Sequence, residues 1–233
     1  MSSFLIRLLA LMSMLIDHAG LALFPSVGLF RCVGRLAFPL YCFLIVQGCR
    51  HTRDIRAYAR RLALLAILSE IPFDLLIFGR TASFVEQNVL FSLLLGLMAI
   101  YTSELLKAKP YYALMANISL CLCAMLANVS YGWLSIALCL SMHAAGSSRL
   151  RLALLTGGSL LLYSLSLLLS GVAISWVLVS LCALFSLIPL LLYNGKRGVR
   201  NPLFTFLFYA AYPLHIILLL IVRAMRIIPP YFF

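Results

Sequence analysis

Residues 8–28 read LLALMSMLIDHAGLALFPSVG, an apolar stretch in which Asp17 and His18 stand side by side. A run of roughly 17 to 25 apolar residues has the length of a helix that crosses a lipid bilayer. An ionisable side chain at the centre of such a helix costs ~2.5–3.5 kcal/mol on insertion scales, so membrane helices keep one where it is paired or functional. The stretch therefore predicts a transmembrane helix over residues 4–24 that carries a polar pair.

The composition extends this interpretation to the whole chain, since 64% of its 233 residues are hydrophobic and only 10% are charged. Soluble domains carry far less apolar and far more charged surface. We predict an all-α, polytopic integral membrane helix bundle that forms a single transmembrane domain over residues 1–233. The nine expected spans cover residues 4–24, 36–50, 60–79, 88–106, 111–128, 131–146, 151–170, 172–193 and 202–223.

The net charge of +12 does not indicate a nucleic-acid binder, because the basic residues lie in short connections rather than on one face of a polar domain. The seven cysteines lie mostly inside apolar runs, where cysteine behaves as a small buried hydrophobe. Cys121 and Cys123 have no nearby partner at a zinc-like spacing, so no metal site is predicted. The chain has neither a GxxxxGK phosphate loop nor a GxSxG nucleophile elbow.

Lysine and arginine are concentrated in every second connection, at residues 50–61, 107–109, 149–151 and 196–200. Cytoplasmic loops carry an excess of these residues, so the alternation predicts a cytoplasmic N-terminus and a C-terminus outside. Two pairs of arginines stand out on the side that this scheme places outside: Arg31 and Arg35 in a connection, and Arg223 and Arg226 at the end of the last span. Snorkelling toward lipid headgroups is one explanation for them.

Further polar residues fall in the outer half of the expected bundle. Glu70 and Asp74 are four residues apart and share one helix face, and Pro72 between them predicts a kink. Tyr212 and His215 lie three residues apart around Pro213 in the last span. Because isolated charges are costly in hydrocarbon, we expect mutual pairing of Arg31 and Arg35 with Glu70 and Asp74. This cluster is either purely structural or a functional site.

His18 is the natural general base of the cluster, because imidazole titrates near neutral pH. Neighbouring side chains on a helix point about 100° apart, so its carboxylate partner is either Asp17 or a residue of another helix such as Glu70. His215 is a second candidate base. Arg31 or Arg35 would stabilise a developing negative charge.

The basic connection at residues 50–61 has two explanations. It either sets only the orientation of the protein, or it also binds a phosphate-rich cytosolic molecule, since arginine holds phosphate through two parallel hydrogen bonds. The candidate residues for such binding are Arg50, Arg53, Arg60 and Arg61.

Several motifs together resemble the TraX family, in the family's order and over residues 6–223. They are RLLALMSMLIDHAG, GRLAFPLYCFLIVQGCRHTRDIRAYARRL, SEIPFD, QNVLFSLLLGL, SYGWLSIAL and FYAAYPLHIILL. The resemblance implies a multi-spanning acetyltransferase of the bacterial inner membrane that uses acetyl-CoA as its donor. The family's named member N-acetylates the pilin of a conjugative pilus, which implies a pilin or envelope acceptor here.

The family is similar to wider groups of membrane acyltransferases with a histidine in an early helix and a YxxH-like motif late in the chain. By that analogy His18, Tyr212 and His215 are candidate catalytic residues, with Asp17, Glu70, Asp74 and Arg35 around them. Two other hypotheses stay open: a proton-coupled transporter that uses the same ionisable groups, and a non-enzymatic assembly protein of a pilus or envelope complex. The halves of the chain show no convincing repeat of the kind that transporters often have.

Overall fold

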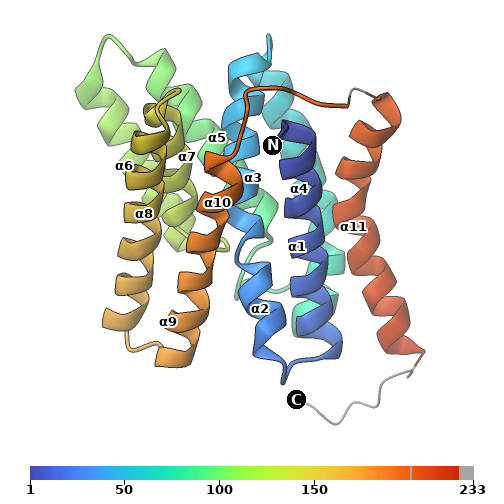
Figure 1. The fold of residues 1–233 in the computed structure, drawn as a ribbon. Coiled ribbons are helices and arrows are strands. Elements are labelled where there is room, and N and C mark those ends of the chain that lie inside the picture. The colour runs from blue at the N-terminus through green and yellow to red at the C-terminus, as the bar shows by residue number, and fades with distance from the viewer. Residues whose placement is uncertain (200, 226–233) are drawn as a thin grey trace. The chain divides into compact units, whose positions relative to one another are not determined.

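A computed structural model describes residues 1–199 and 201–225, and within these residues it is built from helices without a β-strand. Figure 1 labels the elements along the chain. The α-helices are α1 (Ser3–Leu23), α2 (Gly28–Gly34), α3 (Ala37–His51), α4 (Ile55–Phe78), α5 (Val89–Leu105), α6 (Pro110–Leu126), α7 (Leu134–Ala145), α8 (Arg149–Leu169), α9 (Ile174–Leu181), α10 (Leu187–Leu191) and α11 (Pro202–Ala224). A 3₁₀ helix, η1 (Cys182–Ser186), joins α9 to α10.

Each of the nine predicted spans coincides with a helical segment, which confirms the all-α prediction. Five segments are long and apolar enough to cross a membrane, so the protein is a multi-pass helical membrane protein. They are Ser3–Leu23, Gly28–His51, Arg149–Leu169, Ile174–Leu191 and Phe206–Ala224. The helices α5, α6 and α7 are apolar but shorter, and α4 carries Arg61, Glu70 and Asp74 in its apolar part. The number of spans and their orientation stay predictions.

The segment around Arg31 differs from the prediction, which placed Arg31 and Arg35 in a connection outside the membrane. Both residues lie within the helical stretch Gly28–His51, Arg31 inside α2 and Arg35 directly after it. The basic residues made this part of the chain look like a loop. Arg31 is accommodated within a helix because a carboxylate on α1 binds it.

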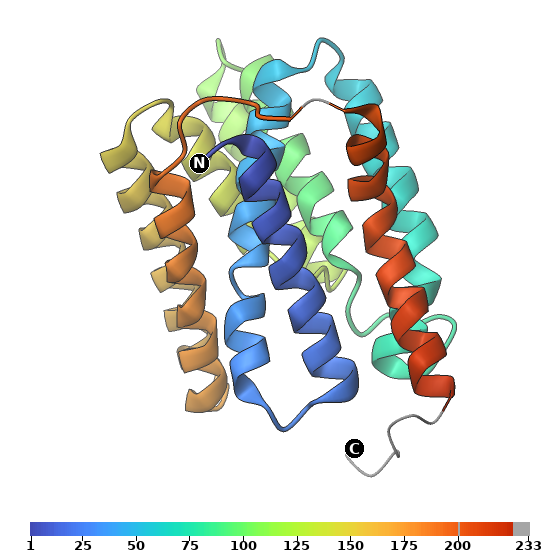
Figure 2. The same ribbon diagram turned by 45° about the vertical axis from the view of Figure 1, so that its right-hand side comes forward.

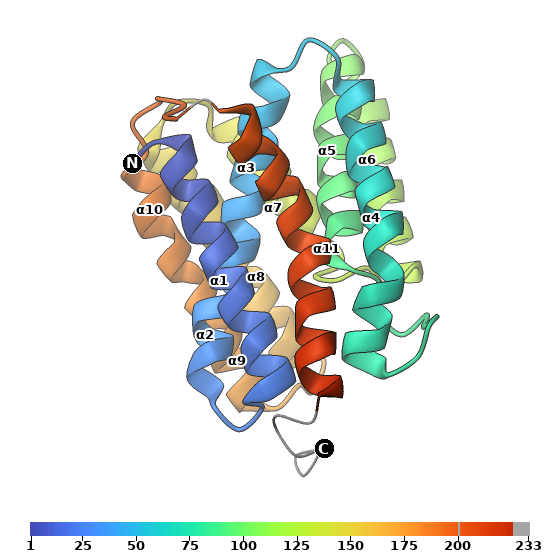
Figure 3. The same ribbon diagram turned by 90° about the vertical axis from the view of Figure 1, so that its right-hand side faces the viewer.

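The chain divides into two compact units, each described by itself. The first comprises residues 1–40, 68–83 and 164–233. Within it α1 packs against α2, to which a short connection joins it (Figure 2), and also against α11 (Figure 3). Phe4 of α1 lies edge-on against two rings of α11, with centroids 5.5 Å from Phe204 and 6.0 Å from Phe208.

The second unit comprises residues 41–67 and 84–163. In it α5 packs against α6 and α7, and Figure 3 shows α5 beside α6. Asn88 is fully buried at the start of α5, where its Oδ1 caps the helix and its Nδ2 donates to the carbonyl of Ala66 at 2.9 Å. The helices α3, α4 and α8 contribute residues to both units. The single transmembrane domain over residues 1–233 stays a prediction.

Two glycines of α2 form a matched pair that tests the contact between α1 and α2. A Cβ atom on Gly34 would overlap the side chain of Asp17, whereas one on Gly28 would meet nothing within 4 Å. We expect Gly34→Ala to lower the melting temperature of the detergent-solubilised protein by several degrees, because overpacking costs about 1–3 kcal/mol. The variant Gly28→Ala should match the wild type. Equal melting temperatures for the two variants would contradict this packing.

Candidate functional site

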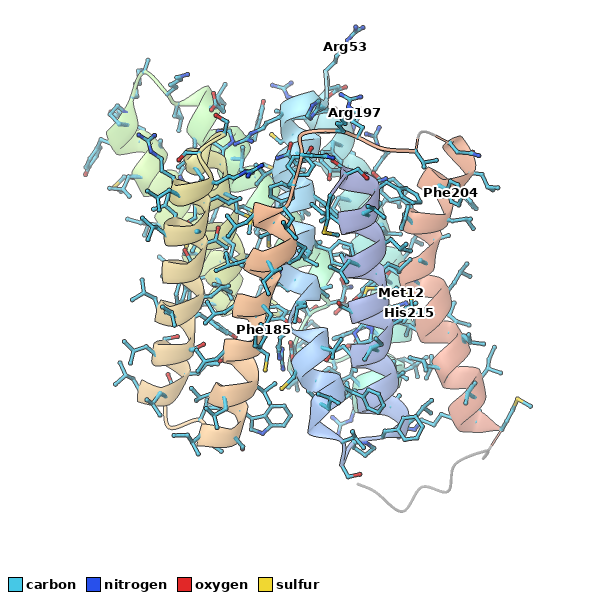
Figure 4. All side chains as sticks on the ribbon, in the orientation of Figure 1. Met12, Arg53, Phe185, Arg197, Phe204 and His215 are labelled. Carbon is cyan, nitrogen blue, oxygen red and sulfur yellow. The ribbon has the colours of Figure 1, made fainter. Side chains whose placement is uncertain are left out.

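Two histidines from opposite ends of the chain meet in the first unit. Nδ1 of His18, on α1, lies 2.6 Å from Nε2 of His215, on α11. The ring planes are within 10° of each other and the centroids are 4.9 Å apart. In Figure 4, His215 lies between α11 and α1. The sequence indicated each histidine as a candidate base but not their direct hydrogen bond.

Tyr212 completes this group. Its ring centroid lies 6.2 Å from that of His18 and 5.6 Å from that of His215, and the ring meets both imidazoles at 72°. Tyr212 is only 4% exposed. The spacing of three residues in α11 brings Tyr212 and His215 to one face of the helix. The structure therefore brings together the three residues that the YxxH analogy singled out.

Asp17 faces a different partner from its neighbour. Its Oδ1 accepts a hydrogen bond from Nη1 of Arg31 at 2.8 Å, and the two side chains are 16% and 17% exposed. The Arg31 guanidinium also lies 5.9 Å from the ring centroid of Trp176 on α9, which is a cation–π distance. Arg35 is close enough for its charge to act on the Asp17 carboxyl group.

The expected pairing of Arg31 with Glu70 or Asp74 was therefore wrong. Adjacent side chains on α1 diverge by about 100°, and this turns Asp17 toward α2 while His18 faces α11. Trp176 was not identified from the sequence, because no local pattern marks an aromatic ring that will contact a guanidinium. For Arg35 and Glu70 the expected pairing stays a prediction.

Asp74 has a local partner in the first unit. It is 2% exposed, and its Oδ2 accepts a hydrogen bond from the backbone N–H of Ser83 at 2.7 Å. The carboxylate thereby fixes the chain just after α4, and its other oxygen is enclosed without a hydrogen-bond partner among the described residues. Glu70, one turn earlier on α4, is half-buried. The contact with Ser83 gives Asp74 a structural role at the end of α4.

Comparison with known proteins identifies the family. Residues 2–223 match the family model described as "TraX protein". This chain belongs to the TraX family. It is 30% identical, over 94% of each chain, to a "Probable fimbrial assembly protein FimC, serogroup H1" of Dichelobacter nodosus.

A second similar protein is an uncharacterized protein of Rickettsia prowazekii (strain Madrid E). It is 32% identical over 42% of this chain and 36% of its own length. No solved structure matches the chain. The comparisons confirm the resemblance of the sequence motifs to the TraX family.

Arg223 of this TraX-family protein has an explanation other than snorkelling. Its Nη1 donates a hydrogen bond of 3.0 Å to the carbonyl of Leu76, in the last turn of α4. The last carbonyls of a helix lack partners within the helix and carry partial negative charge, so Arg223 stabilises the end of α4. Arg226 lies outside the described residues.

The four candidate donor-binding arginines all lie in the second unit of the TraX-family chain. Arg50 donates to the carbonyls of Met142, His143 and Gly146 at 3.1–3.3 Å, so it stabilises the end of α7. Arg53 points away from the helices in Figure 4. Arg53, Arg60 and Arg61 are exposed. These three are therefore the better placed of the four to meet a ligand from the aqueous phase.

The described residues contain no group of three or more His, Cys, Asp or Glu side chains able to hold a metal ion. In the second unit, Nε2 of His143 and Oε1 of Glu104 lie 2.8 Å apart, at hydrogen-bond distance.

Proposed function

We propose that this protein is a membrane-embedded acyltransferase. It transfers an acetyl group from acetyl-CoA to an amine or hydroxyl acceptor, such as a pilin N-terminus or an envelope component. The observation that supports this proposal most directly is the hydrogen-bonded pair of His18 and His215 between apolar helices. An ionisable pair inside a membrane bundle indicates a functional site, and imidazole is the side chain best suited to move a proton near neutral pH.

The reaction needs a base and a stabiliser of negative charge. His18 takes the proton of the attacking amine or hydroxyl, and the acceptor atom forms a bond to the acetyl carbon. The C–S bond of the thioester then breaks, and the leaving thiolate takes the proton back from His18. Negative charge on the carbonyl oxygen during this step calls for a nearby cation. Arg31 meets this need best, because its charge acts on His18 as well as on Asp17.

The donor carries phosphate groups that arginine binds well. Two exposed arginines lie on the basic segment, Arg53 just before α4 and Arg60 in its first turns. Positive-inside orientation would turn this segment to the cytoplasm, where acetyl-CoA is found, and would place the protein in the inner membrane. The name of the Dichelobacter nodosus relative, a probable fimbrial assembly protein, supports a pilus-related acceptor.

Binding and transfer of acetyl-CoA test this proposal on purified, detergent-solubilised protein. We expect saturable binding of acetyl-CoA to the wild type, a dissociation constant at least tenfold higher for Arg53→Ala/Arg60→Ala, and wild-type binding by His18→Ala. Only His18→Ala should bind the donor without transferring the acetyl group to a peptide amine. A folded wild-type protein that binds no acetyl-CoA would contradict the acyltransferase function.

A non-enzymatic role in pilus or envelope assembly is the second candidate. The printed name of the relative describes assembly and no chemistry. In that case His18 would only hold α1 to α11, and a variant that keeps the helices together would keep the function. The variant His18→Asn distinguishes the two candidate functions, provided that its abundance in the membrane is that of the wild type. Loss of the acetylated product would support the enzyme, whereas unchanged formation of pili would support the assembly protein.

A further inference from the structure

We propose that His215 is a positioning residue, which sets the tautomer of His18 and leaves Nε2 of His18 as the basic atom of the site. This inference rests on the proposed acyltransferase function and assigns the two histidines different tasks. The sequence pointed to either histidine as a base and to a carboxylate as the partner of His18. The structure instead supplies an imidazole as that partner.

His215 makes a hydrogen bond to the backbone of its own helix, α11. Nδ1 of His215 lies 2.7 Å from the carbonyl oxygen of Ala211, one turn earlier. A carbonyl oxygen only accepts hydrogen bonds, so Nδ1 of His215 carries the proton and donates. In a neutral imidazole one nitrogen donates and the other accepts. Nε2 of His215 is therefore an acceptor.

The acceptor on His215 determines the protonation of His18. Nδ1 of His18 lies 2.6 Å from Nε2 of His215, and only a proton on Nδ1 of His18 makes this contact a hydrogen bond between two neutral rings. Nε2 of neutral His18 then carries the lone pair. It makes no hydrogen bond to any residue that the structure describes, and His18 is a half-buried residue.

In this arrangement His18 is the base and His215 is the group that orients it, as in other sites where a third side chain orients the catalytic base. The proton of the acceptor amine or hydroxyl passes to Nε2 of His18, and the imidazolium keeps its Nδ1–H bond to His215. The same proton leaves Nε2 for the thiolate when the C–S bond breaks. The carbonyl of Ala211 holds His215 in place throughout, because both belong to one turn of α11.

The neighbouring charged and titratable groups favour an imidazole over a carboxylate at this position. The positive charge of Arg31 acts on His18. The carboxylate of Asp17 already binds that guanidinium and supplies one negative charge beside it. Tyr212 faces both rings edge-on. A neutral histidine can orient His18 without adding a second negative charge beside Asp17.

Two substitutions separate positioning from mere packing. In His215→Gln the terminal amide can offer an oxygen near the position of Nε2, so it can still accept from His18. In His215→Asn the shorter amide reaches only the position of Nδ1 and leaves His18 without its acceptor. We expect His215→Asn to lower kcat about 10- to 100-fold, the loss seen when a group that orients a metal-bound histidine is removed, with KM for acetyl-CoA unchanged. The variant His215→Gln should keep kcat within about threefold of the wild type.

The tautomer itself is read from the full-length protein with ¹⁵N-labelled histidine. The chain has four histidines, and single replacements of His18, His51 and His143 assign their ring signals. We expect neutral His18 to show a protonated Nδ1 and an unprotonated Nε2, and this pattern to be lost in His215→Asn. A proton on Nε2 of neutral His18, or equal kcat values for the Gln and Asn variants, would overturn the inference.

The two measurements also distinguish this inference from the proposed function. If the spectrum shows the expected tautomer but no variant or wild-type sample transfers acetyl groups, the acyltransferase function fails and the tautomer assignment is supported. If transfer is measured and the tautomer is the reverse, the function is supported and the positioning role of His215 is overturned.

Discussion

His18→Ala should lower acetyl transfer about 10²- to 10⁴-fold, which is the usual contribution of a general base, while the protein still inserts into the membrane. The variant removes the imidazole whose Nδ1 binds His215, and with it the proposed base of the reaction. Transfer from radiolabelled acetyl-CoA to a peptide amine measures the effect. Protein abundance in the membrane fraction is followed in parallel.

His51→Ala is the matched control. His51 is exposed at the end of α3, and its Nδ1 is 2.7 Å from the carbonyl of Gln47 in the same helix. We expect this variant to retain wild-type transfer. Full transfer by His18→Ala at normal abundance would remove His18 from the mechanism, and with it the assignment of Nε2 as the base.

Asp17→Ala should lower the free energy of unfolding by about 3–5 kcal/mol, which is the usual cost of leaving a buried ion without its partner. Arg31 would keep its charge in the apolar stretch Gly28–His51 but lose the carboxylate that binds it at 2.8 Å. The melting temperature of detergent-solubilised protein and the fraction recovered in the membrane both measure this loss.

The double variant Asp17→Ala/Arg31→Met tests the cause of that loss. Replacing a buried ion pair by apolar residues is often neutral or stabilising, so we expect most of the wild-type stability to return. The methionine also fills part of the space beside Trp176, which the Arg31 guanidinium contacts. A double variant as unstable as Asp17→Ala alone would show that the carboxylate stabilises the protein through some other contact.

The long helices and the local spacings of this protein could be predicted from its sequence alone, although the short helix α2 could not. The length of the apolar runs predicted helices that the structure confirms, because a bilayer-spanning chain must satisfy its backbone hydrogen bonds within each helix. The spacing of Tyr212 and His215 placed both on one face of α11. These features depend on residues within a few turns of each other, so a local pattern is sufficient.

The pairs of polar groups that meet could be identified only once the helices were packed against one another. His18 and His215 are 197 positions apart, and Asp17 and Arg31 are 14 apart. Asp17 and His18 are neighbours in the chain, yet the helical turn of about 100° per residue sends them to different helices. Because α1 packs against both α2 and α11, Asp17 contacts α2 and His18 contacts α11. The contact between α1 and α2 also supplies the partner of Arg31, because the carboxylate that binds this arginine lies on α1 and not on its own helix. The free energy of a charge inside an apolar bundle depends on such a partner.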